Sequence, residues 1–147
     1  MSSYIDLEGL IVARLEQRVT ALPAGRVLTL PDMAAVDERA QITPALHLIF
    51  AGEHVAEPPR GAIQQLATQQ WVVIVAVRSA EEILTGAAAR AAAGPLVAAV
   101  NEALIGWTPG PEYEPMVRTG GLRTTYRHGF LYYPQAFACT FPIRGVR

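Results

Sequence analysis

The sequence predicts an α+β domain with a single mixed or antiparallel sheet and helices packed mainly on one face. Three observations support this class. An amphipathic segment opens the chain, a continuous β-branched apolar run lies at its centre, and an aromatic segment with alternating apolar residues closes it. The chain has 147 residues and shows no internal repeat or long linker, so we expect one domain spanning residues 1–147.

The first predicted element is a surface helix. Asp6 is placed to cap its start, and Pro23 with Gly25 is placed to end it. The charged residues of this segment fall mostly off the apolar stripe, so one side of the helix is expected to be buried. The stripe keeps helical spacing and consists of Leu7, Ile11, Leu15, Val19 and Leu22.

The centre of the chain predicts strands. Val27–Leu30 is a short extended piece, Ala45–Ala51 is a strand, and Gly52–Gly61 is a turn or exposed loop. Trp71–Val77 is apolar on both alternating faces, which predicts a central strand covered on both sides. Residues 62–70 fit either an extension of that strand or its hairpin partner.

Two helices are predicted next. Ser79–Ala93 is helix-prone, and Gly94-Pro95 interrupts it, because proline suits the first position of a new helix. The second helix is expected to end at the segment Gly106–Pro111. Its buried stripe consists of Leu96, Val97, Val100 and Leu104.

The C-terminal third is β-like. Met116–Tyr126 contains the pair Gly120-Gly121, which fits a turn or a bulge. After it, alternating apolar residues predict a closing strand. These are Tyr132, Tyr133, Phe137, Cys139, Phe141 and Ile143.

No motif for catalysis, cofactor binding or metal binding is found. The signatures of zinc hydrolases, phosphate-binding loops and dinucleotide folds are absent. Cys139 is the only cysteine, which excludes an internal disulfide and favours a buried, inert thiol. The carboxylate pairs Glu81-Glu82 and Glu112-x-Glu114 fit a helix start and a solvated loop. We therefore predict no cofactor and no enzymatic activity.

Membrane insertion and secretion are not expected. No apolar run reaches the roughly 18–20 residues that cross a bilayer. The segment that starts at Met1 lacks the basic start and apolar stretch of a signal peptide. The chain is therefore expected to stay in the compartment where it is made.

Charge is unevenly distributed along the chain. All 12 basic residues are arginine; residues 1–114 carry seven of them against 13 carboxylates, a net −6, whereas residues 115–147 carry a net +5. One acidic and one basic surface can pair between subunits. The candidate interface residues are Arg118, Arg123, Arg127, Glu112 and Glu114.

Two segments carry a resemblance to a known family. The strand-like run Gln70–Arg78 is followed, after an alanine-rich stretch, by Ala93–Leu96 and by Ala103–Pro109, which contains a leucine–x–glycine–tryptophan–x–proline element. From Leu7 to Phe141 the chain resembles the tail-terminator (tail-completion) proteins of long-tailed phages, in particular the Mu-like type.

The resemblance implies a structural role in the virion tail, assembled in the host cytoplasm. Such proteins form a ring, usually of six subunits, on the last ring of the tail tube, where they stop polymerisation and present the head-joining surface. The implied partners are other copies of the chain, the tail tube protein and the head–tail connector proteins. The arginines of the C-terminal third then either face an acidic neighbour or line a lumen through which DNA passes.

Two other functions stay open at this point. One is a different neck component, such as a head-closure or connector protein, which shares this size and habit. The other is a small ligand-binding or enzymatic α+β domain whose site is assembled from scattered residues; a deep pocket with convergent polar groups is the feature that favours it.

Overall fold

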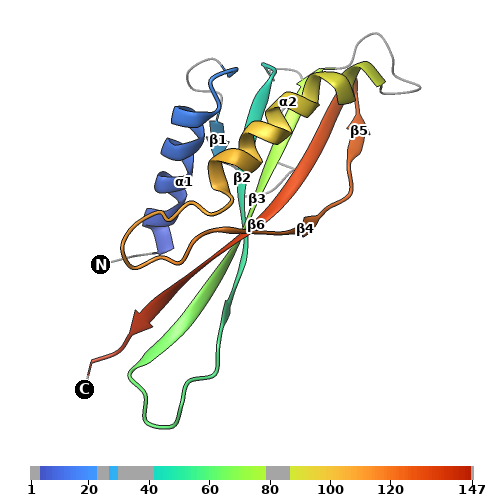
Figure 1. Ribbon diagram of the computed structural model, residues 1–147. Helices are drawn as coiled ribbons and strands as arrows, with labels where there is room; N and C mark the ends of the chain where they lie inside the picture. Colours follow the sequence, from blue (N-terminus) through green and yellow to red (C-terminus); the bar gives the residue numbers. More distant parts are fainter. Residues whose placement is uncertain (1–3, 23–26, 30–41, 79–86, 147) are drawn as a thin grey trace.

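The computed structural model describes residues 4–22, 27–29, 42–78 and 87–146, which form two helices and a six-stranded mixed sheet (Figure 1). This confirms the predicted α+β class with a single sheet. In chain order the elements are α1 (Tyr4–Arg18), β1 (Val27–Thr29), β2 (Ala45–Val55), β3 (Gln64–Arg78), α2 (Ala87–Leu104), β4 (Val117–Gly121), β5 (Thr125–Arg127) and β6 (Phe130–Arg144).

The sheet is organised around two long central strands. Its order is β1-β2-β3-β6-β4, with β5 also paired to β6, and only β1 and β2 run parallel. The strands β3 and β6 are each 15 residues long and pair from Gln64↔Arg144 to Arg78↔Phe130. At about 3.3 Å per residue this ladder is roughly 50 Å long. It extends well past the helices (Figure 1).

Both helices lie against one face of the sheet, at the end where β3 finishes and β6 begins (Figure 1). In α1 the first three residues of the predicted stripe, Leu7, Ile11 and Leu15, are buried, whereas Val19, which is also buried, and Leu22, which is partly buried, follow the end of the helix at Arg18. The predicted cap is wrong: the helix begins at Tyr4, so Asp6 lies in its first turn, where a carboxylate still favours the positive end of the helix.

A single helix replaces the predicted break at Gly94-Pro95. The helix α2 runs through both residues. Pro95 lies on the exposed side, so the backbone bond that it removes falls where water can reach the freed carbonyl. Packing outweighs the local preference, because the buried stripe is continuous on the other side. That stripe is Ala89, Ala93, Leu96, Val100, Ala103 and Leu104.

Apolar side chains are buried on both faces of the sheet in this half of the molecule. All seven residues of Trp71–Val77 are buried, which confirms the predicted central strand. The larger cluster joins the helices to the sheet, and its fully buried members include Phe137 and Phe141. The cluster on the opposite face is smaller: Val72, Ile74, Ala76, Phe130 and Tyr132.

The strand β2 is longer than predicted. It continues past Ala51 to Val55, so the expected turn over Gly52–Gly61 is partly strand. A register shift between Phe50 and Gly52, with Gly52 at φ 123°, lets the strand bend and go on instead of ending. Residues 64–70 are confirmed as the extension of the central strand rather than a separate hairpin partner.

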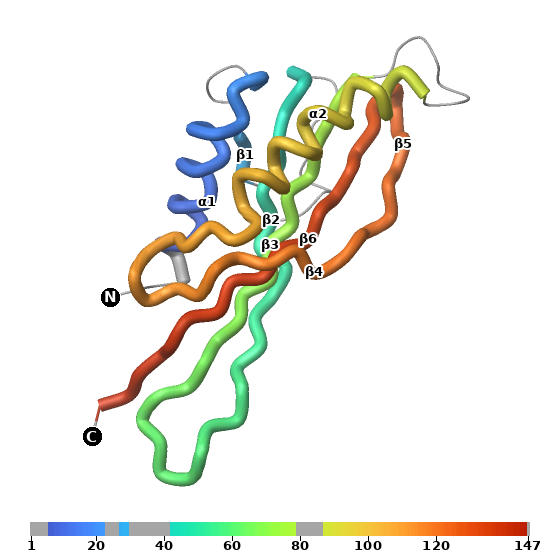
Figure 2. Tube along the Cα trace, in the orientation of Figure 1, coloured from blue at the N-terminus to red at the C-terminus, as the bar shows by residue number. Residues whose placement is uncertain are grey.

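This lengthening produces what we call the projecting arm, residues 50–66 and 142–144. The arm consists of the far ends of β2, β3 and β6 and the connection between β2 and β3. It is a narrow ribbon that projects from the rest of the molecule, which we call the body (Figure 2). No residue of the arm is buried.

Several predictions fall on residues outside the described ranges. They include the helix stop at Pro23 and Gly25, most of the segment between β1 and β2, and the start of the helix-prone stretch, including Glu81 and Glu82.

Candidate functional site

The projecting arm exposes large apolar side chains. Phe50 is 47% exposed, Ile63 47%, Leu66 42% and Val55 36%, whereas every residue of Trp71–Val77 in the body is at most 8% exposed. Surface apolar side chains gathered on one protruding element are typical of protein-contact sites. The arm is therefore a candidate contact surface, and sequence reasoning did not single out its residues.

Side-chain contacts tie the arm to the body at its base. The rings of Phe50 and Trp71 meet edge to face with centroids 5.2 Å apart. The indole Nε1 of Trp71 donates to Gln69 Oε1 at 3.2 Å, and Gln69 Nε2 donates to Glu53 Oε1 at 3.4 Å. Because Trp71 and Gln69 are buried, this chain of bonds holds the exposed residues Phe50 and Glu53 in place.

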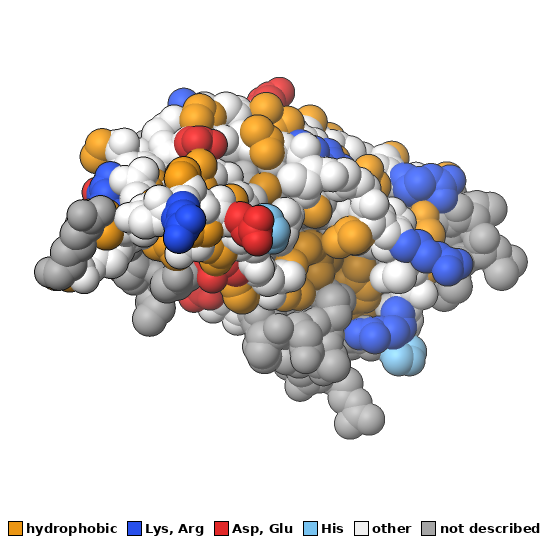
Figure 3. All heavy atoms as spheres, turned by 90° about the horizontal axis from the view of Figure 1, so that it is seen from below, with side chains coloured by type: hydrophobic (Ala, Val, Ile, Leu, Met, Phe, Trp, Pro, Cys, Tyr) orange, Lys and Arg blue, Asp and Glu red, His pale blue; other side chains and the backbone are white. Residues whose placement is uncertain are grey.

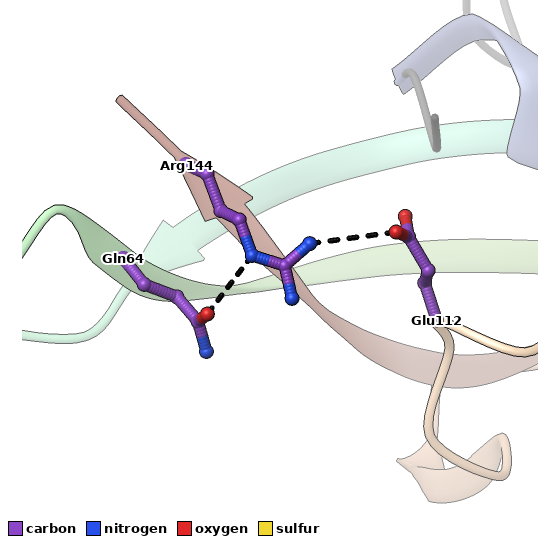
Figure 4. A network of polar contacts seen from close by, with 3 residues as sticks. All are labelled: Gln64, Glu112 and Arg144. Atoms are coloured by element: carbon purple, nitrogen blue, oxygen red, sulfur yellow. Dashed lines mark hydrogen bonds and ion pairs between the residues drawn. The ribbon is translucent and has the colours of Figure 1, made fainter. Parts of the chain in front are cut away.

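An ion pair joins the arm to the segment after α2. Arg144 Nη1 lies 3.4 Å from Glu112 Oε1, and Arg144 Nε donates to Gln64 Oε1 at 3.0 Å (Figure 4). Both charged side chains are more than a third exposed, so the pair contributes at most about 1 kcal/mol to the free energy of unfolding. Glu112, predicted as an interface residue, thus has a partner within its own chain.

The predicted interface residue Glu114 is exposed and lies beside β6. Its backbone N–H donates to the Thr140 carbonyl at 2.8 Å, and its own carbonyl accepts a bond from Cys139 Sγ at 3.6 Å. Cys139 is buried as predicted, and burial, with a smaller effect from the Glu114 carboxylate, raises the pKa of its thiol to about 12. A thiol with this pKa stays protonated at neutral pH and is a poor nucleophile.

Arg118 is partly committed to the body. It lies at the register shift in β4 between Arg118 and Gly120, so of the two alternatives predicted for the glycine pair, a turn or a bulge, the structure fits the bulge. Its Nη1 donates to Asn101 Oδ1 of α2 at 2.9 Å, and its guanidinium carbon lies 6.0 Å from the centre of the Phe137 ring. The side chain therefore helps to join β4 to α2.

The other two predicted arginines lie at the β4–β5 side of the sheet. Arg123 is exposed in the connection between β4 and β5, and Arg127 is exposed on β5 with its guanidinium 5.7 Å from the Tyr132 ring centre. Arg78, at the end of β3, takes the same position over Phe130 at 5.5 Å. Viewed from the arm end, arginine side chains lie on this side of the molecule, whereas the centre and the other side carry acidic side chains together with further arginines (Figure 3).

Trp107 supports the segment that follows α2. The side chain is partly buried and packs against the main core. The Arg14 guanidinium of α1 lies 5.5 Å from its ring centre, and Arg14 Nε donates to the Ala103 carbonyl at 2.9 Å. The Trp107 carbonyl in turn accepts a bond from the Met116 N–H at 2.9 Å. These contacts fix the path of residues 105–116 toward β6.

Two further searches concern only the described part of the chain. Within it, no group of three or more His, Cys, Asp or Glu side chains is arranged to hold a metal ion. Neither of its helices is long and apolar enough to span a membrane.

The structure thus brings Glu112 and Glu114 close to β6 and Arg123 and Arg127 to the β4–β5 side, rather than into one cluster. Comparison with curated proteins gave no significant match. A family model described as phage tail terminator protein matches residues 1–147, the whole chain. The chain therefore belongs to the phage tail terminator family, whose members are structural components of the virion tail.

Proposed function

We propose that this chain caps the tail tube as a ring, stops tube polymerisation and presents the surface that joins the head. The observation that carries the proposal is the match of the tail-terminator model to the entire chain. The ring is proposed to contain six copies, to assemble in the host cytoplasm and to bind the tail tube protein on one side and connector proteins on the other. Catalysis plays no part in this role.

The shape of the molecule supports a contact role for the arm. A tube cap has to bind the last ring of the tube through a surface that is available before assembly. The arm offers such a surface, because its apolar side chains Phe50, Val55, Ile63 and Leu66 are exposed and its strands are paired, β2 with residues 67–71 of β3 and residues 64–66 of β3 with residues 142–144 of β6. A preformed ribbon loses less conformational entropy on binding than a disordered segment. We propose that the arm contacts the tail tube or a neighbouring subunit.

The experiment is polymerisation of the cognate tail tube protein in the presence of increasing amounts of this chain, followed by electron microscopy. The expected result is shorter tubes with a ring at one end only. The matched variants are Ile63→Glu/Leu66→Glu in the arm and Ala91→Glu on the exposed surface of α2. The arm variant is expected to lose capping, and the helix variant to keep it.

Unchanged tube lengths and bare tube ends, with a chain that circular dichroism shows to be folded, contradict the terminator role. Capping by both variants leaves the terminator role standing and removes the arm from it.

A further inference from the structure

The strands of the projecting arm give it little support of their own. Toward its tip, residues 64–66 of β3 pair with residues 142–144 of β6, and no residue of the arm is buried. A ribbon of two strands without a packed face is at best marginally stable by itself. Contacts at the base of the arm therefore decide how firmly it holds one direction relative to the helices.

The segment between α2 and β4, residues 105–116, is a closed loop that we call the brace. It leaves the end of α2 and returns to β4 where the sheet narrows into the arm (Figure 1). Its two ends are bonded to each other, because the Gly106 N–H donates to the Met116 carbonyl at 2.8 Å and the Met116 N–H to the Trp107 carbonyl at 2.9 Å. Three of its residues are proline, which fixes φ and reduces the conformations open to the segment. The brace is therefore stiff for a segment without helix or strand.

Both helices hold one side of the brace. Trp107 packs against the main core, and the guanidinium carbon of Arg14 in α1 lies 5.5 Å from the centre of its ring. The same arginine donates from Nε to the Ala103 carbonyl of α2 at 2.9 Å. The brace thus starts from a point that is fixed relative to α1 and α2.

The other side of the brace follows β6 into the arm. Three consecutive residues of the brace contact β6 in antiparallel order, the direction in which β4 also runs. The pairs are Glu114 with Thr140, Tyr113 with Phe141, and Glu112 with Arg144. The first is a backbone hydrogen bond of 2.8 Å, the second an edge-to-face ring contact at 5.3 Å, and the third an ion pair at 3.4 Å (Figure 4). The brace therefore extends along β6 beyond the start of β4 and reaches the arm.

Tyr113 makes the firmest side-chain contact on this side of the brace. Its side chain is 8% exposed and belongs to the main core. Its ring packs on Phe141, which is fully buried and directly precedes the arm residue Pro142. The ion pair of Arg144 is exposed and weak, whereas a buried aromatic pair contributes more than its area alone.

We propose that the brace sets the direction of the projecting arm relative to the helices, with Tyr113 and Arg14 as positioning residues. Tyr113 holds the brace to the strand that enters the arm, and Arg14 holds it to the helices. The consequence for tube capping rests on the contact role proposed for the arm. An arm held in one direction loses less conformational entropy on binding than an arm that samples many.

The distance between the arm and the helices tests this in the free chain. Spin labels on Arg60→Cys in the connection between β2 and β3 and on Glu16→Cys in α1, both exposed positions, report that distance by double electron–electron resonance. Cys139 stays unlabelled, because it is 1% exposed and burial raises the pKa of its thiol to about 12. This labelled parent chain is expected to give one narrow distance distribution.

Four substitutions in the labelled chain separate the brace from general stability. Tyr113→Leu removes the ring contact and is expected to widen the distribution at least about twofold, because weakly supported strand ends open locally at low cost. Arg14→Ala acts from the far side of the brace and is expected to widen it by less. Tyr113→Phe keeps the ring and is expected to keep the parent width. Leu48→Ala lies in the main core of the body, outside the brace, and is expected to lower stability without widening the distribution.

Two results overturn the proposal. One is the parent width in both Tyr113→Leu and Arg14→Ala, when urea titration shows both chains to be folded. The other is equal widening in Leu48→Ala, because the width then follows stability rather than the brace.

Tube capping by the same variants is measured separately, so that this inference and the proposed function can fail independently. Tyr113→Leu is expected to need about tenfold more chain to cap tubes, because the loosened arm has to be ordered on binding. Capping at the wild-type level by this variant, with a widened distribution, removes arm direction from the capping role and leaves the terminator role standing. A wild-type chain that leaves tubes uncapped contradicts the proposed function, whereas the distances in the free chain still decide about the brace.

Discussion

The strands β2, β3 and β6 run through both the body and the projecting arm, and the two regions differ in what surrounds these strands. In β3, the residues Trp71–Val77 are all buried, whereas the arm residues Gln64–Leu66 of the same strand are half-buried or exposed. The backbone ladder is continuous through both. Along these strands, the buried residues that stabilise the fold lie in the body, and the exposed residues that can contact partners lie in the arm. The body is expected to set the free energy of unfolding, and the arm to meet partners.

The largest expected change in the free energy of unfolding separates two leucine-to-alanine substitutions, one in the body and one in the arm. Leu48 of β2 is 1% exposed and lies in the main core, whereas Leu66 of the arm is 42% exposed. Leu48→Ala is expected to lower the free energy of unfolding by about 2–5 kcal/mol, because it removes buried contacts and leaves a cavity. Leu66→Ala is expected to lower it by less than about 1 kcal/mol. Urea denaturation of both variants measures the difference, and equal losses contradict the division.

The next largest change in the free energy of unfolding is expected in the helix layer, which only the body has. Pro95→Ala restores a helical N–H on the exposed side of α2. A proline in a helix interior is about 3 kcal/mol less favourable than alanine, and the greater freedom of alanine in the unfolded chain offsets part of this. The expected gain is about 2 kcal/mol in urea denaturation. A loss of stability contradicts this account of how α2 tolerates proline.

A smaller effect is expected at the contact between the two helices. Arg14→Ala removes the bond to the Ala103 carbonyl and the stacking on Trp107. The expected loss is about 1 kcal/mol, since the side chain is only half-buried. Arg14→Lys is expected to recover less than half of it, because lysine cannot reproduce the planar guanidinium. Thermal melts of both variants check this, and full recovery with lysine contradicts a stacking contribution.

The remaining effect depends on pH and concerns His47 of β2. Burial lowers the pKa of His47 in the body, so the folded state holds it neutral while the unfolded chain takes up a proton below about 6.5. The contribution of neutral His47 to the free energy of unfolding is therefore fully present above that pH. It is lost as the pH falls below it, because the unfolded chain then binds a proton that the folded state does not. The expected slope is at most about 1.4 kcal/mol per pH unit for one group.

Stability measured by urea titration between pH 5 and pH 7 tests this. His47→Gln is expected to flatten the slope. An unchanged slope in this variant contradicts the assignment.

Much of the body could be predicted from the sequence because its patterns are strong and local. The stripe from Leu7 to Val19 fits only a helix with one buried side, and the run Trp71–Val77 fits a strand buried on both faces. The glycine pair Gly120-Gly121, predicted as a turn or a bulge, lies at a bulge in β4. In each case the local preference and the tertiary packing agree.

The failures occur where tertiary contacts decide against local signals. Gly94-Pro95 signals a break, yet α2 continues because its buried stripe is uninterrupted. Gly52 signals a turn, yet β2 continues because β3 supplies a partner for every residue from Gly52 to Val55. No local pattern shows that Arg144 meets Glu112, because they come together only once β6 is paired along its whole length. The arm itself was missed for the same reason.

The central claim is that the arm meets partners while the body supplies stability, and hydrogen exchange read by mass spectrometry tests it most directly. The chain is measured alone and bound to cognate tail tubes. The account predicts that peptides covering residues 72–77 exchange slowest in both states, and that new protection on the tubes is concentrated in residues 50–66 and 142–144. Protection confined to α1 and α2, with the arm unchanged, would contradict it.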